Sequence, residues 1–360
     1  MPFPKRYSLL KVSFAFLTIP VCYIAFSKYY DLLDKDLILS KLNSLGLSLL
    51  IILLPYFFII LSDTFGWKYS FGKIKSQIAS AKLFLLRLAT ETLQTSLPGG
   101  AVYAEIVRPI LLKKHFRLEY CNSISANIIT KLNVMIAQLL FFILGICLIT
   151  ISLRDEISLL SLPEYAIYPS LLIMIVFPFL IAYLIYRRHF LLNLMRYLER
   201  INIKPVKDFV EKIKQPVIEI NNTVSHFSIN HKKDLCVTLA FFFLTWLLMS
   251  FESLIILKVI GVDVDIFQIV VIESLISFVR MIFFFIPGAV GPQDVVIIIL
   301  FNLSGISDPQ SNALVFLLFK RVKEFFWIAI GYILLIILGI SPYDLIKSKK
   351  TDFLPAKEIL

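Results

Sequence analysis

The chain has 360 residues, of which 58% are hydrophobic and only 17% are charged, and its mean hydropathy is +0.84. Soluble globular domains do not reach such values, so the composition predicts an all-α polytopic membrane protein. The formal net charge of +11 would also fit a nucleic-acid-binding protein, so the distribution of the charges has to decide between the two classes.

Six apolar stretches approach the roughly 20 residues that an α-helix needs to cross a bilayer. These predicted full spans are residues 12–27, 37–62, 121–152, 165–186, 235–257 and 311–340. Lys5 and Arg6 precede the first one as in a signal peptide, but no A-x-A-like cleavage site follows, so we interpret it as an uncleaved span. Two further apolar stretches, at about 78–112 and 266–303, are each interrupted near the middle by a Pro-Gly pair.

Lys and Arg gather in alternate loops, among them a predicted loop at 63–82. With the N-terminus placed in the cytoplasm, 24 of these residues fall on the cytoplasmic side and four on the outer side. The positive-inside rule produces this asymmetry, and it predicts that both termini are cytoplasmic. The basic excess therefore reports orientation and contact with anionic lipid headgroups, and we expect no nucleic-acid partner.

A long polar stretch at 187–233 divides the chain. The predicted organisation is a first membrane half at 1–186, a cytoplasmic amphipathic connector at 187–233, a second membrane half at 234–342 and a cytoplasmic tail at 343–360. Apolar residues recur at helical spacing from Phe190 to Ile201, which indicates a helix on the inner membrane surface. Neither polar segment is long enough for an ordinary catalytic domain, so any chemistry must lie within the membrane.

The two halves resemble each other around their prolines, in "TSLPGGAVYAEIVRP" from Thr95 and "FFIPGAVGPQDVV" from Phe284. At one constant offset the matched positions are Pro98-Gly99 with Pro287-Gly288, Glu105 with Asp294, Lys131 with Lys320, and Glu91 with Arg280, the last pair opposite in sign. Charged residues are rare in apolar stretches, so four coincidences at one offset predict an internal repeat.

The flanking charges give this repeat a direction. Basic residues flank the first interrupted stretch on both sides, whereas the segments 261–265 and 304–310 around the second contain no Lys or Arg. Each stretch is therefore predicted to be a re-entrant Pro-Gly helical hairpin, and the two halves form an inverted repeat, the architecture of alternating-access transporters. The half-helix after each break would point its free N–H groups and positive dipole end at an anion inside the bilayer.

A charge at the bilayer centre costs about 3 kcal/mol, so charged side chains in these helices are expected to face the protein interior. The predicted substrate-binding residues, which hold an anionic headgroup, are Gly99, Gly100, Arg108, Lys131, Gly288, Arg280 and Lys320. The predicted coupling or gating acids are Glu105, Asp294, Glu91 and Glu273. For Glu105 and Asp294, salt bridges that lock the hairpins are an equally good interpretation. No residue spacing predicts a metal site, a P-loop, a catalytic group or a cofactor.

The paired Pro-Gly motifs, the acid seven residues later and the basic residue that opens the next span resemble the flippase-like integral membrane family named for the transmembrane region of lysylphosphatidylglycerol synthases. The resemblance covers about 8–340. It implies a bacterial cytoplasmic (inner) membrane protein that moves an anionic, aminoacylated or glycosylated lipid between leaflets. The second motif departs from the family, because Ala289 replaces a glycine and Pro292-Gln293 precede Asp294. The aminoacyl-transferring domain of bifunctional members is absent, so we expect no lysyl-lipid synthesis.

The sequence therefore predicts a lipid translocator rather than an enzyme, with membrane lipids as its partners. Two alternatives stay open. The chain could be a non-catalytic membrane partner of a lipid-modifying enzyme or a glycosyltransferase. It could also be an intramembrane enzyme that acts on lipid-linked substrates and uses the same carboxylates as acid and base.

Overall fold

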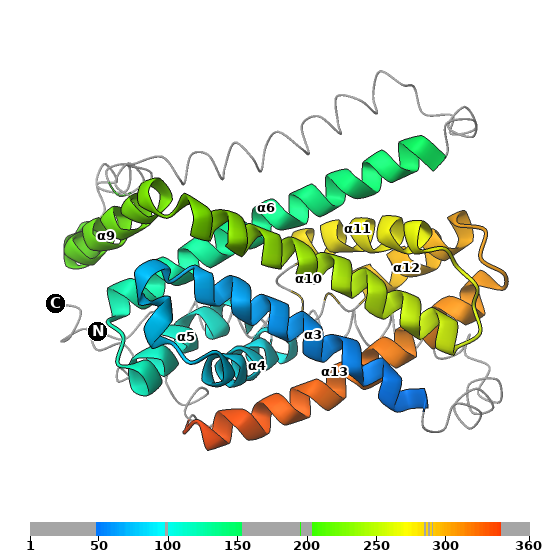
Figure 1. Ribbon diagram of the computed structural model, residues 1–360, viewed down its shortest axis with the longest axis horizontal. Coiled ribbons are helices and arrows are strands. Elements are labelled where there is room, and N and C mark those ends of the chain that lie inside the picture. Colours follow the sequence, from blue (N-terminus) through cyan, green and yellow to red (C-terminus); the bar gives the residue numbers. More distant parts are fainter. Residues whose placement is uncertain are drawn as a thin grey trace. The chain divides into compact units, whose positions relative to one another are not determined.

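The computed structural model describes residues 48–97, 100–152, 195, 204–283, 286, 289 and 291–339, and every regular element among them is helical (Figure 1). In chain order these elements are α3 (Ser48–Tyr69), the 3-10 helix η1 (Gly72–Gln77), α4 (Ser80–Ser96), α5 (Gly100–Phe116), α6 (Tyr120–Ser152), α9 (Lys204–Asn230), α10 (Lys232–Val259), α11 (Ile266–Ile282), α12 (Pro292–Leu303) and α13 (Pro309–Ile337). The predicted all-helical class is confirmed for this part of the chain.

Three of these helices are long and apolar enough to cross a membrane: α3 over Ile51–Tyr69, α6 over Tyr120–Ile149, and all of α10. The predicted spans 121–152 and 235–257 correspond to α6 and α10. Helix α13 covers most of 311–340 without a break, although four charged residues lie in its middle. The predicted spans 12–27 and 165–186, the surface helix at 190–201 apart from Met195, and the tail 343–360 lie outside the described residues.

The predicted end of the second span and the predicted loop at 63–82 are wrong. Helix α3 continues through Asp63 to Tyr69, and most of the remaining segment is also helical, as η1 and the start of α4. Asp63 suggested a polar loop because an isolated carboxylate is costly in an apolar helix. The structure removes that cost with a contact from another helix, since Arg87 in α4 forms an ion pair with Asp63.

Both interrupted stretches form two helices separated by a break, as predicted. Helix α4 ends at Ser96 and α5 begins at Gly100, while α11 ends at Ile282 and α12 begins at Pro292. The residues of the two Pro-Gly pairs lie outside the described residues. Near the second break, Ala289 has a φ of 50°, a left-handed conformation that is strained for a residue with a side chain.

The helix bounds recur at the same offset that separates Pro98 from Pro287. The start of α13 follows the start of α6 by this offset. The end of α10 follows the end of α3 by the same offset to within one residue. The order long helix, short helix, short helix, long helix therefore occurs twice. At this offset Asp63-Thr64 in α3 also match Glu252-Ser253 in α10, a pair of acids that extends the repeat beyond the motifs around the prolines.

Contacts divide the chain into two compact units. The first unit contains the described residues within Met1–Phe57, Glu91–Ala104 and Leu248–Ile330. Its core is an apolar cluster from the C-terminal part of α10 and from α11, α12 and α13, in which the rings of Phe301 and Phe316 lie 5.4 Å apart. Helices α11 and α12 contact each other directly within this unit (Figure 1).

The second unit contains the described residues within Phe58–Thr90, Glu105–Leu247 and Gly331–Leu360. Helix α9 packs against α6 in this unit (Figure 1). Ile220, Val224 and Phe227 of α9 lie on one helical face and are buried in a cluster with Ile129 of α6. Burying each such side chain contributes about 1.5–3 kcal/mol, so the apolar face holds this part of the connector against α6.

Gly100 stands where α5 begins directly after α4, and the close approach of the two helix ends requires its lack of a side chain. A Cβ at this position would lie 2.0 Å from the carbonyl oxygen of Leu93 and 2.7 Å from that of Gln94. The backbone of α4 would have to move, so we expect Gly100→Ala to lower the free energy of unfolding by about 3 kcal/mol, the upper end for overpacked sites. Unfolding by SDS titration, followed by helical circular dichroism, measures this loss.

Gly261→Ala is the matched control for this prediction. Gly261 has a φ of 81°, but no heavy atom lies within 4 Å of the position that a Cβ would take. Its substitution should therefore cost only the left-handed conformation, about 1 kcal/mol. Equal losses of unfolding free energy in the two variants would show that close contact with α4 is not the reason why position 100 needs a glycine.

Candidate functional site

Charged side chains inside the apolar helices gather in each unit. The first-unit cluster comprises Glu252, Glu273, Arg280, Asp294, Lys320, Arg321, Lys323 and Glu324, and the second-unit cluster comprises Asp63, Arg87, Glu105, Arg108 and Lys131. Each cluster draws its members from several helices, so local spacing reveals only the i,i+3 pairs Glu105–Arg108 and Arg321–Glu324.

Glu273 in α11 lies at the centre of the first-unit cluster and is only 2% exposed. Its Oε1 accepts hydrogen bonds from Nζ of Lys320 and from Oγ of Ser253. Its Oε2 lies 3.6 Å from an Nη atom of Arg280. One buried carboxylate is thus shared by two cations. Glu273, Lys320 and Arg280, the Glu273 triad, carry one negative and two positive charges and hence a net charge of +1.

The two cations of the triad differ in the hydrogen-bond donors that remain available to a ligand. Lys320 is buried and in direct contact with the carboxylate. The side chain of Arg280 is 26% exposed, and its distance to Glu273 is longer than a hydrogen bond. Its Nε donates to Oε1 of Gln293 at 3.0 Å, and Nη1 faces the Sδ of Met249 at 3.8 Å, a weak acceptor. Arg280 is therefore the cation of this triad that keeps strong donors for a ligand.

Asp294 makes two contacts that fasten α12. Its Oδ2 accepts the backbone N–H of Gly291 at 3.0 Å, just before the helix begins. Its Oδ1 accepts from Arg321 of α13 at 2.7 Å, and Arg321 also donates to Glu324 at 2.7 Å. Asp294 thus caps one helix and ties it to another, which fits the interpretation that this acid forms a locking salt bridge.

Glu252 and Lys323 form a second buried ion pair in the same cluster. Lys323 Nζ lies 2.6 Å from Glu252 Oε1, and both side chains are almost completely buried. The ammonium group also lies over the ring of Tyr56, 4.9 Å from its centroid. The pair joins α10 to α13.

In the second unit, Glu105 is likewise shared by two cations. Its Oε1 lies 2.5 Å from Arg108 and 3.1 Å from Lys131. Arg108 is buried, donates through Nε to the hydroxyl of Thr90 at 3.3 Å, and lies over the ring of Trp67. The side chains of Glu105 and Lys131 are 31% and 40% exposed, so this pair forms the accessible part of the second-unit cluster.

Asp63 is a member of the second-unit cluster that the sequence analysis missed. Arg87 binds one of its oxygens at 2.6 Å, and the hydroxyl of Thr245 in α10 donates to the other at 3.1 Å. The available signal was the repeat itself, because Asp63 stands at the constant offset from Glu252. Both acids lie in long helices and both pair with a cation from another helix.

The repeat-equivalent residues do not make equivalent contacts. Glu105 pairs with Lys131, but their counterparts separate, since Asp294 pairs with Arg321 and Lys320 with Glu273. Of the other predicted site residues, Glu91 lies half-buried in α4, and Gly100 donates its backbone N–H to the carbonyl of Leu97 at 2.8 Å. Gly99 and Gly288 lie outside the described residues.

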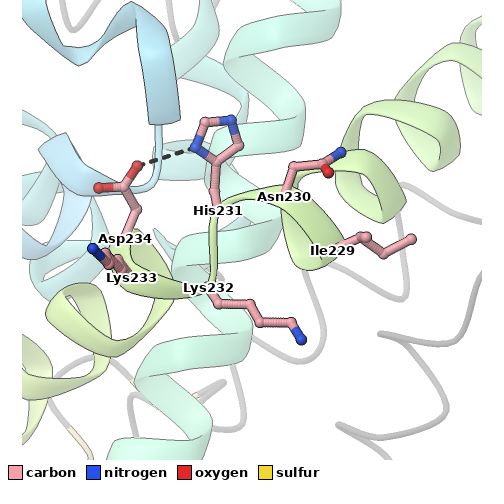
Figure 2. A pocket seen from close by; sticks show the side chains of 6 residues that line it. All are labelled: Ile229, Asn230, His231, Lys232, Lys233 and Asp234. Carbon is pink, nitrogen blue, oxygen red and sulfur yellow. Dashed lines mark hydrogen bonds and ion pairs between the residues drawn. The ribbon is translucent and has the colours of Figure 1, made fainter.

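A hollow of about 480 Å³ opens at the surface of the second unit, where α9 ends and α10 begins (Figure 2). Residues Ile229 to Asp234 line it. Figure 2 shows the ring of His231 turned toward Asp234, 3.2 Å away, and Lys75 of η1 binds the same carboxylate. These contacts join η1 to the α9–α10 junction. The hollow contains none of the predicted site residues, and nowhere in the described ranges do three or more His, Cys, Asp or Glu side chains gather as a metal site would require.

A chain with several bilayer-length apolar helices and ion pairs buried among them is a multi-pass membrane protein. The family described as "Lysylphosphatidylglycerol synthase TM region" matches residues 9–336, and the chain belongs to this family. The resemblance inferred from the Pro-Gly motifs is thereby confirmed, and it links the protein to lipid metabolism. Comparison with curated proteins and with solved structures found no match.

Proposed function

We propose that this protein translocates a lipid with an anionic headgroup between the leaflets of the bacterial cytoplasmic membrane. The observation that carries the proposal is Arg280, the more exposed cation of the Glu273 triad, whose guanidinium lies 3.6 Å from the shared carboxylate among apolar helices. A partly exposed guanidinium in such surroundings can pair with a lipid phosphate while the acyl chains of that lipid remain in an apolar phase. Arg280 is suited to the contact, because a guanidinium binds phosphate oxygens in pairs.

The transport architecture we propose is six spans and two re-entrant hairpins in an inverted repeat. Its support is the twofold order of the helices, the breaks after α4 and α11, and the opposite charges of the flanking segments. Broken helices in inverted repeats place a binding site near the bilayer midplane and expose it to each side in turn. With both termini in the cytoplasm, the first hairpin would open inward and the second outward.

Within this scheme the acids have different roles. Asp294 and the Glu252–Lys323 pair lock helices of the first unit, since each fastens α13 to another helix. Glu105, whose side chain is more exposed and faces both Arg108 and Lys131, is the acid that we assign to gating or coupling. The proposal invokes no catalytic residue and no cofactor. The driving force would be a proton gradient or the downhill movement of the lipid itself.

Lipid retention tests the headgroup site. We expect the protein, extracted with its surrounding lipid and examined by native mass spectrometry, to hold an anionic phospholipid in preference to bulk zwitterionic lipid. Arg280→Gln removes charge-assisted hydrogen bonds that contribute about 1.5–3 kcal/mol, so the retained anionic lipid should fall at least tenfold. Arg117→Gln, at an exposed arginine before α6, is the matched control and should retain the lipid.

Two outcomes would count against the proposal. If the three proteins retained the same anionic lipid to the same extent, the site would not be at Arg280. If the unsubstituted protein carried only bulk lipid, the alternative of a non-catalytic partner of a lipid-modifying enzyme would be favoured, and a co-purifying enzyme would be the next thing to look for.

A further inference from the structure

We infer that Gln293 is a positioning residue that orients the guanidinium of Arg280 and makes the headgroup site selective for anions. The inference rests on the proposed function, because it concerns the same site. Gln293 carries no charge, so the rarity of charged residues in apolar helices does not distinguish it in the sequence.

Gln293 is the second residue of α12, immediately after Pro292, and is only 2% exposed. Buried side-chain amides are normally hydrogen-bonded, because an unpaired one is costly. In the part of the chain that the structure describes, the bond that the carboxamide makes is the one to Nε of Arg280, at 3.0 Å. A buried amide at the start of a helix is thus committed to a single arginine from the preceding helix.

The chemistry of arginine fixes which way the carboxamide points. A guanidinium only donates hydrogen bonds, so the atom of Gln293 that faces Arg280 must be the oxygen. The NH2 group then lies on the other arm of the carboxamide, which the bond to Arg280 does not use. A phosphate oxygen held by Arg280 would be an acceptor for this group, so the amide can both orient the arginine and contact the ligand.

The neutral charge of Gln293 matters as much as its geometry. A bond to Nε restrains the plane of the guanidinium and leaves the two Nη groups facing Met249 and the distant oxygen of Glu273. Because the acceptor is neutral, the positive charge of Arg280 is not cancelled. A glutamate at the same position would accept the same hydrogen bond but would bring the Glu273 triad and residue 293 together to two negative and two positive charges.

The substitution Gln293→Glu separates these two roles, because it keeps the acceptor and changes the charge. Gln293→Met removes the acceptor at similar length and adds no charge. Gln268→Glu is the matched control. Gln268 is exposed in the first turn of α11, where its side chain caps the backbone N–H of Asp265, and a glutamate can make the same capping contact.

The measurement is the ratio of phosphatidylglycerol to phosphatidylcholine bound by the full chain from vesicles that contain equal amounts of both, determined by native mass spectrometry. We expect the ratio to fall at least tenfold in Gln293→Glu, to fall severalfold in Gln293→Met and to stay unchanged in Gln268→Glu. Folded Gln293→Glu protein with the ratio of the unsubstituted protein overturns the inference. If Gln293→Glu does not fold, Gln293→Met protein with the ratio of the unsubstituted protein overturns the inference.

The result for the unsubstituted protein separates the failure of this inference from that of the proposed function. A preference for phosphatidylglycerol that survives both substitutions at 293 leaves the headgroup site in place and removes Gln293 from it. No preference in the unsubstituted protein removes the site, and the inference about Gln293 falls with it.

Discussion

We expect Glu273→Gln to lower the free energy of unfolding by about 3–5 kcal/mol, the range for removing one partner from a buried ion pair. Glu273 is the carboxylate shared by Lys320 and Arg280, and it also accepts the hydroxyl hydrogen bond of Ser253. A neutral amide would leave the buried ammonium of Lys320 without the carboxylate that it contacts, although the shape of the side chain is preserved. SDS titration in detergent, followed by circular dichroism, measures the loss.

Two further variants identify the cause of this loss. Asp263→Asn makes the same chemical change at an exposed acid of the same unit and should have no effect within about 0.5 kcal/mol. Adding Lys320→Met to Glu273→Gln removes the buried cation and should recover a large part of the lost stability, because an apolar replacement of a buried pair is often neutral. A double variant less stable than Glu273→Gln alone would contradict the electrostatic explanation.

The second large effect concerns the Glu252–Lys323 pair. Both side chains are almost completely buried and each is the other's ion-pair partner at 2.6 Å, so we expect Glu252→Ala and Lys323→Ala each to destabilise the protein by at least about 3 kcal/mol. The exchange Glu252→Lys with Lys323→Glu restores an ion pair in the opposite direction. It should be more stable than either single variant. An exchange variant as unstable as the sum of the two single changes would show that the packing of these chains, not their charges, holds α10 to α13.

The sequence was sufficient for the helices because their determinants are local. Apolar stretches of bilayer length predicted α6 and α10, and the Pro-Gly pairs predicted where α4 and α11 give way to the next helix. The same motifs also led to the family, which matches residues 9–336. Position along the chain was enough in each case, because a helix forms and ends according to residues within a few turns of each other.

Apart from pairs three residues apart on one helix, the partners of the charged residues could not be predicted, because they depend on which helices pack together. Repeat spacing equated Lys131 with Lys320 and Glu105 with Asp294, yet Lys131 pairs with Glu105 whereas Lys320 does not pair with Asp294. Lys320 pairs instead with Glu273, an acid of α11.

Two residues were missed for different reasons. Asp63 was assigned to a loop because its charge seemed to end a span, and its compensation by Arg87 comes from another helix. Gln293 was missed because it carries no charge, and a neutral amide becomes informative only when the structure shows the arginine that it binds. The roles of Gly99 and Gly288 at the breaks stay predictions.

The most direct test of the central claim is the movement of an anionic lipid by the purified protein. Vesicles with fluorescent phosphatidylglycerol in both leaflets are treated with an impermeant reductant that bleaches only the outer leaflet. With the unsubstituted protein present, we predict bleaching of nearly all of the fluorescence, and with Arg280→Gln bleaching close to that of protein-free vesicles. Bleaching by the unsubstituted protein that stops at the outer-leaflet fraction, as in protein-free vesicles, both with and without an imposed proton gradient, would contradict the assignment of lipid translocation.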